Sequence, residues 1–542
     1  MNKLFEDLER MKKKNKEKYL RTFGNVKEDP FDFEQIEHYF RKKDHSAAFQ
    51  VLSDKTCKDM DFNELFTFLD RTNSKVGQQF LYNKLRTIPS GSDRSAHEKL
   101  ISEFTNNSNF RVNIQYQLSK LDKMEAFYIH SLFQDEHLKP PKWFFVIRLL
   151  SFMSLLLLIM LFFYSQAFFA FLGVFIINAG VHYWNKRNLY PYLSSLPQLL
   201  KLNSIARDLF GYDLLKKINP NLQESIKIVD RIKNRISFFK MEADLQGDLV
   251  AIVWSFIELF KILFLLEPLL LFGVLKQLDN KRKAIEEIFM FVGQIDALFS
   301  VASLREGLHS YCIPTIEKEQ KKIVAKDAYH PLIRDCVENS IEATHKSVLL
   351  TGSNMSGKTS FIKTIGINVI TGLTLNTCFS KEFKMPKLRL YKAIRINDDL
   401  MNDKSYYFEE VLTIKKMIDN SGNGTNLFLL DEIFKGTNTV ERVSAGKAVL
   451  RFLAEAGNIV FVSTHDIELA DLLKSEYSLY HFSEKVDNNK TVNFDYKLKE
   501  GKLKNRNAIQ ILQANDYPVE VIHEAIKISE ELEKNYYSAF RE

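Results

Sequence analysis

The sequence contains little cysteine, four residues in 542, and these lie far apart: Cys57, Cys312, Cys336 and Cys378. No two of them form a C-x-x-C pair. Disulfide frameworks and structural zinc sites both depend on suitably spaced cysteines. The sequence therefore indicates neither, and a reducing compartment fits its cysteine usage.

A strong excess of charge of one sign is also lacking. The 75 Lys and Arg stand against 68 Asp and Glu, which gives a formal net charge of +7. Such a balance permits contact with nucleic acid or anionic lipid but argues for neither. Residues 1–20 are rich in Lys and Glu and have no apolar core of the signal-peptide kind, so we expect a solvated helix or tail there.

A phosphate-binding loop is present in the C-terminal half. An apolar run at 347–351 predicts a strand, and the loop and a helix-like segment follow it directly. Glycines at both ends of such a loop let backbone N–H groups point at phosphates, and the positive end of the helix adds to this. Lysine supplies a cation for the β- and γ-phosphates, and the Thr359 hydroxyl can ligate Mg²⁺. The predicted ATP-binding residues are Gly352, Ser353, Asn354, Met355, Ser356, Gly357, Lys358, Thr359 and Ser360.

Polar residues end two further apolar runs. Asp431 and Glu432 follow the run that begins at Leu427, and His465 follows the run 458–462. We predict that Asp431 holds Mg²⁺ and that Glu432 polarises the attacking water; the predicted catalytic residues are Glu432, His465 and Lys358. A lone histidine is more often structural, but one that follows a core strand in a P-loop protein is placed to sense the γ-phosphate.

The pattern of the chain changes along its length. Residues 47–132 show apolar residues at helical spacings of three and four, with a loop expected at 88–93. This pattern predicts an all-helical region. From residue 318 onward, strand-like runs alternate with helical segments, which is typical of a parallel sheet with crossover helices.

One long segment carries almost no charge. Between Trp143 and Trp184 the only charged side chain is that of Arg148. The segment has room for two membrane helices, 143–163 and 167–184. Lysines and arginines flank both ends, and such flanks mark the cytoplasmic side. We expect a transmembrane hairpin in the plasma (inner) membrane, with both soluble domains cytoplasmic; a buried hairpin in a soluble protein is the alternative.

A second apolar stretch, 249–274, is interrupted by charges. Glu258, Lys261 and Glu267 lie within it, and Pro268 follows. Because a charge within lipid is costly, we interpret this stretch as a buried or interfacial helix. A third crossing would also place the P-loop outside the cell.

Several segments resemble those of the MutS family of DNA mismatch repair ATPases. These are Thr351-Gly-Ser-Asn-Met-Ser-Gly-Lys-Thr359, Asp398-Asp399-Leu400, Lys404-Ser405-Tyr-Tyr-Phe-Glu-Glu410 and Asp431-Glu432-Ile-Phe-Lys-Gly436-Thr437-Asn438-Thr439. The resemblance implies an ABC-type α/β P-loop ATPase domain behind a helical core and lever. It also implies ATP and Mg²⁺ as cofactors, and a homodimer in which Ser405 of one chain closes over the γ-phosphate held by the other.

The resemblance continues outside the ATPase region, with departures. Similar segments are 69–72, 76–78, 84–86, 293–298, 507–509 and 518–522. The separate domain that reads mismatches in the family has no counterpart ahead of the core, and Phe62-Asn-Glu64 lies on a predicted core helix. Ser353, Ser356 and Tyr406-Tyr407-Phe408 also depart from the family pattern. We therefore expect no mismatch reading and an altered nucleotide affinity or rate.

The sequence thus predicts five parts. They are a charged segment (1–45), a first helical core part (46–142), the hairpin (143–185), a second core and lever part (186–318), and the ATPase domain with a helical tail (319–542). The predicted function is a membrane-anchored, MutS-like ATPase that uses hydrolysis as a conformational switch. Membrane lipid, DNA without mismatch specificity and an unknown protein are the expected partners. The alternative is a nucleotide-binding membrane scaffold that acts on a protein partner without any role on DNA.

Overall fold

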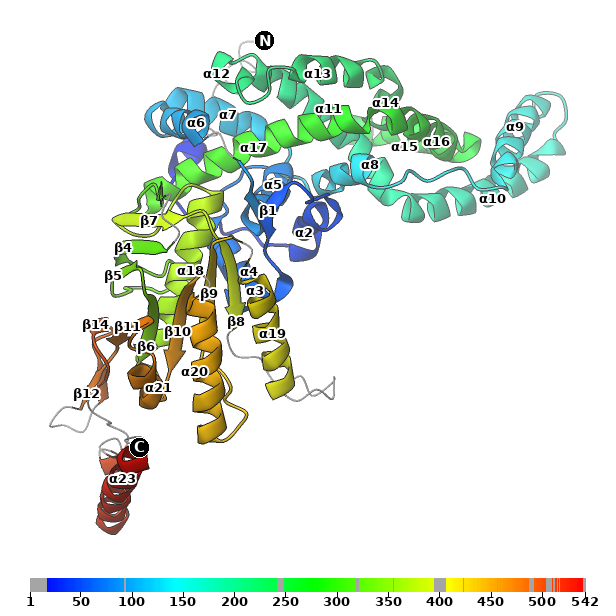
Figure 1. Cartoon of the computed structure of the whole chain (residues 1–542). Coiled ribbons are helices and arrows are strands. Elements are labelled where there is room, and N and C mark those ends of the chain that lie inside the picture. Colours follow the sequence, from blue (N-terminus) through cyan, green and yellow to red (C-terminus); the bar gives the residue numbers. More distant parts are fainter. Residues whose placement is uncertain are drawn as a thin grey trace. The chain divides into compact units, whose positions relative to one another are not determined.

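The computed structural model describes residues 17–91, 94–240, 248–317, 321–353, 355–393, 406–422, 424–455, 457–486, 492–503, 509, 512–513, 515 and 517–539 (Figure 1). The chain forms two compact units. Unit 1 comprises Met1–Ala47, Leu69–Arg86 and Gly91–Leu308, and unit 2 comprises Ala48–Phe68, Thr87–Ser90 and His309–Glu542. Two short segments of the predicted helical core are thus grouped with the C-terminal unit.

Unit 1 is helical throughout its described residues. Its longer helices are α2 (Phe33–Lys42), α5 (Lys75–Arg86), α6 (Arg94–Asn106), α7 (Ser108–Ser119), α9 (Phe144–Met160), α10 (Ala167–Asn188), α11 (Tyr190–Phe210), α13 (Leu222–Asp230), α14 (Lys233–Lys240), α15 (Asp248–Phe264), α16 (Leu266–Leu278) and α17 (Arg282–Gly307). Shorter pieces are α8 (Ser131–Gln134), α12 (Asp213–Lys216) and the 3₁₀ turns Met124–His130 and Asp279–Lys281. The long helix α17 packs against α5, α6, α11 and α13 and so forms the centre of this unit.

A buried carboxylate joins α17 to the chain ahead of α5. Asp296 accepts hydrogen bonds from the backbone N–H groups of Asn73 (2.9 Å) and Ser74 (2.8 Å), and from the Ser74 hydroxyl (2.5 Å). The close approach depends on Gly77, because a Cβ atom there would lie 2.1 Å from the Asp296 carboxylate. Two segments that resemble the family, 69–78 and 293–298, therefore meet in the core of unit 1.

The apolar helices of unit 1 pack together with their polar side chains inward. Helices α9 and α10 form the predicted hairpin, and α15 contacts both. Asn178 on α10 donates to the Ser154 hydroxyl and to the Leu263 carbonyl, each at 2.8 Å. Their outer faces are apolar and exposed, with Phe145, Phe152, Phe169 and Phe256 each more than 60% accessible. By length and composition, α10 and the stretch Leu266–Gly307 could each span a membrane, but the apolar window of α10 is only 17% buried whereas that of the other is 83% buried.

Unit 2 is built on a six-stranded sheet in the order β14-β11-β6-β10-β9-β8. The strands are β6 (Ser347–Thr351), β8 (Arg389–Ala393), β9 (Asn426–Asp431), β10 (Ile459–Thr464), β11 (Tyr477–His481) and β14 (Lys499–Glu500). All neighbours pair in parallel except β14, which is antiparallel to β11. Strands β6, β9 and β10 are buried along their whole length, which explains their continuous apolar sequences. The predicted parallel sheet is confirmed.

Helices cover both faces of this sheet. Phe428 and Leu430 pack into a core with α19 (Tyr406–Asn420), α20 (Thr439–Glu455) and α21 (Ile467–Leu472). Leu429, which points the other way, meets α18 (Lys358–Thr374) close to Gly366. A second sheet, in the order β3-β7-β4-β5, comprises Thr315–Glu317, Glu382–Pro386, Lys322–Ala328 and Asn339–Thr344. Unit 2 also contains a hairpin of β12 (Glu484–Val486) and β13 (Val492–Phe494) and the C-terminal helix α23 (Val519–Ala539).

The prediction that residues 47–132 are all helical is wrong in one place. Besides α3 (Asp54–Asp59) and α4 (Phe62–Leu69), this region contains β1 (Ala48–Val51) and β2 (Thr87–Pro89), which pair antiparallel. The loop expected at 88–93 therefore begins with a strand. Gln50 of β1 also bonds to the backbone of Leu390 in β8 through both its amide nitrogen and its amide oxygen, so the ribbon contacts the six-stranded sheet. On α4, Phe62 is buried, as expected for a core side chain.

Candidate active site

The predicted P-loop connects β6 to α18. Gly357 has a φ of +106°, a conformation that side-chain-bearing residues rarely adopt, and a Cβ atom at Gly352 would lie 2.8 Å from the Phe482 carbonyl oxygen. The loop is tightened by the Ser356 hydroxyl, which donates to the Ser353 carbonyl at 2.8 Å. Met355 stands out from it and is 83% exposed, and Ser360 lies in the first turn of α18. Asn354 lies outside the described residues. The order of buried strand, glycine-bounded loop and helix N-terminus is the arrangement that binds phosphate.

The P-loop lysine is folded back onto its own loop. The Lys358 ammonium group donates to the carbonyl oxygens of Gly352 (2.8 Å) and Ser353 (2.7 Å) and is buried. The Ser353 hydroxyl in turn donates to the Glu484 carboxylate at 2.6 Å. Binding a nucleotide would exchange these carbonyl contacts of Lys358 for phosphate oxygens.

The two predicted Mg²⁺ residues touch each other. The Thr359 hydroxyl donates to one oxygen of Asp431 at 2.8 Å, and Ser463 bonds to the other. The contact arises because β9 and β10 are parallel neighbours and β10 also pairs with β6, so that their carboxyl ends meet at one edge. A hydroxyl and a carboxylate are the oxygen donors that suit Mg²⁺, and the pair therefore fits this ion.

Glu432 and His465 also lie together at this edge. One carboxylate oxygen of Glu432 is 2.5 Å from His465 Nε2, and the other pairs with the ammonium group of Lys435. Glu432 is 8% exposed and has a φ of +54°. Burial, together with the charges of Lys358 and Lys435, lowers the pKa of His465 to about 4. At neutral pH the imidazole is therefore uncharged, and its N–H donates to the carboxylate.

The structure adds three residues to this site that the sequence reasoning did not select. Ser463 fixes Asp431, Lys435 neutralises Glu432, and Glu410 bonds to the loop that follows Glu432. Lys435 and Glu410 both stand within segments that resemble the family, which was the available signal. Ser405, predicted to act on a partner's nucleotide, and Asp398 lie outside the described residues.

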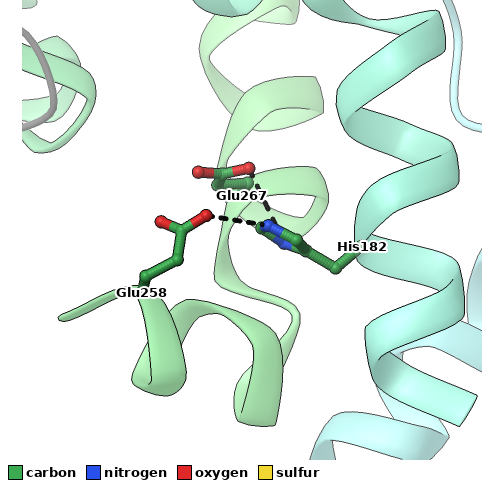
Figure 2. A group of neighbouring side chains, drawn as sticks. All are labelled: His182, Glu258 and Glu267. Carbon is green, nitrogen blue, oxygen red and sulfur yellow. Dashed lines mark hydrogen bonds and ion pairs between the residues drawn. The ribbon is translucent and has the colours of Figure 1, made fainter. Parts of the chain in front are cut away.

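A second group of chemically active side chains lies in unit 1, among the apolar helices. Figure 2 shows His182 of α10 between the carboxylates of Glu258 on α15 and Glu267 on α16. Glu258 faces Nε2 at 3.2 Å, and Glu267 faces Nδ1 at 3.8 Å. Lys186 is 3.1 Å from Glu258, and Lys261 is 3.1 Å from Glu267.

This cluster fits an ion-pair network better than a metal site. A metal ion bound by His182 would use one ring nitrogen, but the two carboxylates face different nitrogens. The two lysines already supply the positive charge that two buried carboxylates need. The network therefore fixes α15 and α16 to α10.

Comparisons with known proteins agree with this geometry. A family model described as MutS domain V matches residues 348–533, which contain the P-loop, Asp431, Glu432 and His465. The DNA mismatch repair protein MutS of Aquifex pyrophilus is 26% identical over 269 residues, which cover 48% of this chain and 31% of that protein. MutS of Listeria welshimeri is 28% identical over 285 residues (49% and 32%), and the mismatch repair protein MSH3 of Saccharomyces cerevisiae is 27% identical over 276 residues (48% and 27%).

The matched region thus spans about a third of the length of these relatives. Within it, the strand, the loop and the paired carboxylates occupy the places that the resemblance to this family predicted. Residues 348–533 therefore resemble MutS domain V, and the chain is similar to MutS proteins over about half of its length.

Proposed function

We propose that this protein is a membrane-anchored ATPase of the MutS family that hydrolyses ATP with Mg²⁺ and uses the reaction as a conformational switch. The observation that carries the proposal is the convergence at one sheet edge of Lys358, the Thr359–Asp431 pair and the Glu432–His465 pair. Each has a distinct role in phosphoryl transfer to water.

The residues divide the work as follows. Lys358 and the P-loop N–H groups hold the β- and γ-phosphates, while Thr359 and Asp431 would hold Mg²⁺, which supplies charge neutralisation when bound. Glu432 accepts a hydrogen bond from the attacking water after its contacts with His465 and Lys435 are released. His465, uncharged at neutral pH, has an N–H to offer to the γ-phosphate or to Glu432.

This assignment predicts that Lys358 and Glu432 fail in different ways. Lys358→Ala removes a contact made already in the bound ground state, so ATP affinity falls. Glu432→Gln removes a group needed only for the water attack, so affinity persists and kcat falls by about 100-fold or more. Nucleotide affinity and phosphate release measured on the purified full chain separate the two. A normal hydrolysis rate in Glu432→Gln would remove Glu432 from the mechanism.

Membrane anchoring is proposed for the α9–α10 hairpin, with both ends and the two units cytoplasmic at the inner membrane. The support is its polarity, because Asn178 and Ser154 face inward while large apolar side chains face outward. The rings of Trp143 and Trp184 pack at 5.8 Å, tilted by 56°, at one end of the hairpin, and Trp is enriched at membrane interfaces.

A homodimer and DNA are the proposed partners. Ser405 of one chain is proposed to close over the nucleotide of the other, as the resemblance implies. The relatives are named as DNA mismatch repair proteins, which supports a contact with DNA, here without mismatch specificity. DNA binding would weaken steeply between low and high salt because phosphate contacts release counterions. Absence of any such binding would favour a membrane scaffold that acts on a protein partner.

A further inference from the structure

Helix α19 packs against the loop that follows Glu432, the residue proposed to polarise the attacking water. The carboxylate of Glu410 accepts a hydrogen bond from the backbone N–H of Phe434 at 2.6 Å. The ring of Tyr407, one turn earlier, lies 6.2 Å from the ring of Phe434. Tyr407 also lies close to Gly436 in the same loop, because a Cβ atom at Gly436 would lie 3.0 Å from the Tyr407 Cβ. Two successive turns of α19 therefore hold residues 434–436.

The loop needs such support because its backbone is unusual. Glu432 and Phe434, both non-glycine residues, have φ values of +54° and +60°. Residues persist in this region only where the surroundings fix them, and such positions cluster at functional sites. Glu432 is held on its other side by its own N–H, which donates to the Ser463 carbonyl of β10 at 3.0 Å. The loop is thus tied to β10 at Glu432 and to α19 at Phe434.

The contact between this loop and α19 is made by the buried carboxylate of Glu410. Glu410 is 5% exposed. Burial raises its pKa, while the Phe434 N–H and the charges of Lys435 and Lys55 oppose that rise. Its second oxygen is buried and has no hydrogen-bond partner among the described residues. A carboxylate kept in this setting for packing alone would be replaced at less cost by an apolar side chain.

We propose that Glu410 is a positioning residue for ATP hydrolysis: through the Phe434 N–H it holds the left-handed turn that places the Glu432 carboxylate at the catalytic edge of the sheet. The proposal rests on the proposed function, since it concerns the same reaction. Glu410 itself need not touch nucleotide or water. Its effect should be confined to the step that uses Glu432, which is the attack by water.

The test compares three variants of the full chain. Glu410→Ala removes the acceptor, and because a misplacement of about 1 Å can cost about 100-fold in rate, kcat should fall by roughly 10- to 100-fold. ATP affinity should stay within about threefold, because the P-loop contacts are untouched. Glu410→Gln keeps an acceptor oxygen for the Phe434 N–H and should retain kcat within about threefold. Glu409→Gln changes the preceding carboxylate of the same helix and should match the unaltered protein.

The outcomes separate this inference from the proposed function. If the unaltered protein hydrolyses ATP and Glu410→Ala loses kcat alone, with rescue in Glu410→Gln, the positioning role stands. If Glu410→Ala keeps its kcat, or loses ATP affinity and thermal stability in step with kcat, the role falls while the ATPase assignment survives. If the unaltered protein binds ATP but does not hydrolyse it, both fall together.

Discussion

His465 shows how much of the chemistry at this site depends on a single proton. Its Nε2 lies 2.5 Å from Glu432, close enough for a strong hydrogen bond. Because burial and two lysines lower its pKa to about 4, the ring is neutral across the physiological range, and the contact is a hydrogen bond to a carboxylate rather than an ion pair.

We therefore expect His465 to titrate near pH 4 in the nucleotide-free protein, well below its ordinary value of 6.5. Between pH 4 and pH 6.5, His465 binds a proton in the unfolded chain but not in the folded chain. The free energy of unfolding therefore decreases as the pH falls from about 6.5 to about 4. Bound phosphates, being anionic, should raise the pKa. Histidine side-chain NMR can follow this, with His465→Gln to assign the signal. A midpoint near 6.5 without nucleotide would contradict the structure.

The sequence predicted the metal-binding and catalytic side chains of this site but not all of their contacts. Thr359 and Asp431 were assigned to one metal ion, and the structure brings them within hydrogen-bond distance. Glu410 and Lys435 could not be assigned in this way, because their contacts depend on how a loop of unusual φ values turns back on α19. The spacing of residues in the sequence does not predict such a turn.

At the scale of elements, the contact of α5 with α17 can be tested by a substitution at Gly77. Gly77→Ala would place a methyl group into the Asp296 carboxylate. Because Asp296 also holds Asn73 and Ser74, relief of the clash would break buried hydrogen bonds. We expect a loss of about 3 kcal/mol or more in the free energy of unfolding.

Urea unfolding of the full chain would measure this loss, with Gly91→Ala as the matched control. Among the described residues, no atom lies within 4 Å of a Cβ at Gly91, so that change should stay within about 0.5 kcal/mol. Equal stabilities of the two variants would show that α5 and α17 do not approach this closely.

Elements with a strong local pattern were predicted well, and those made by distant pairing were not. The apolar runs of β6, β9 and β10 are buried on both faces and were recognised as strands. Strands β1 and β2 were missed because they are short, β2 ends in Pro89, and their pairing joins residues about 40 positions apart in sequence. The hairpin helices were found from the absence of charge, although α10 continues to Asn188, beyond the predicted end at Trp184.

For the whole molecule, the proposed membrane orientation of the hairpin predicts that the proposed ATPase domain lies in the cytoplasm. Ser165 lies exposed in the turn between α9 and α10. A cysteine introduced there should react with a membrane-impermeant reagent on intact cells, because the basic flanks keep both helix ends inside. Ser475→Cys, exposed on unit 2, should react only after lysis. Reaction of Ser165→Cys only after lysis would reject the proposed orientation.

The grouping of residues 48–68 with unit 2 also determines when this segment can fold during synthesis of the chain. Met60 packs beside Gly366 of α18, and the ring of Phe68 packs on Phe379, so both side chains wait for partners encoded far downstream. Most of residues 69–308 must leave the ribosome first, which at about 5–20 residues per second is a delay on the order of tens of seconds. The apolar hairpin emerges within that interval. The proposed membrane insertion would therefore precede folding of unit 2, and the nascent chain would carry unpaired core residues until its last third is translated.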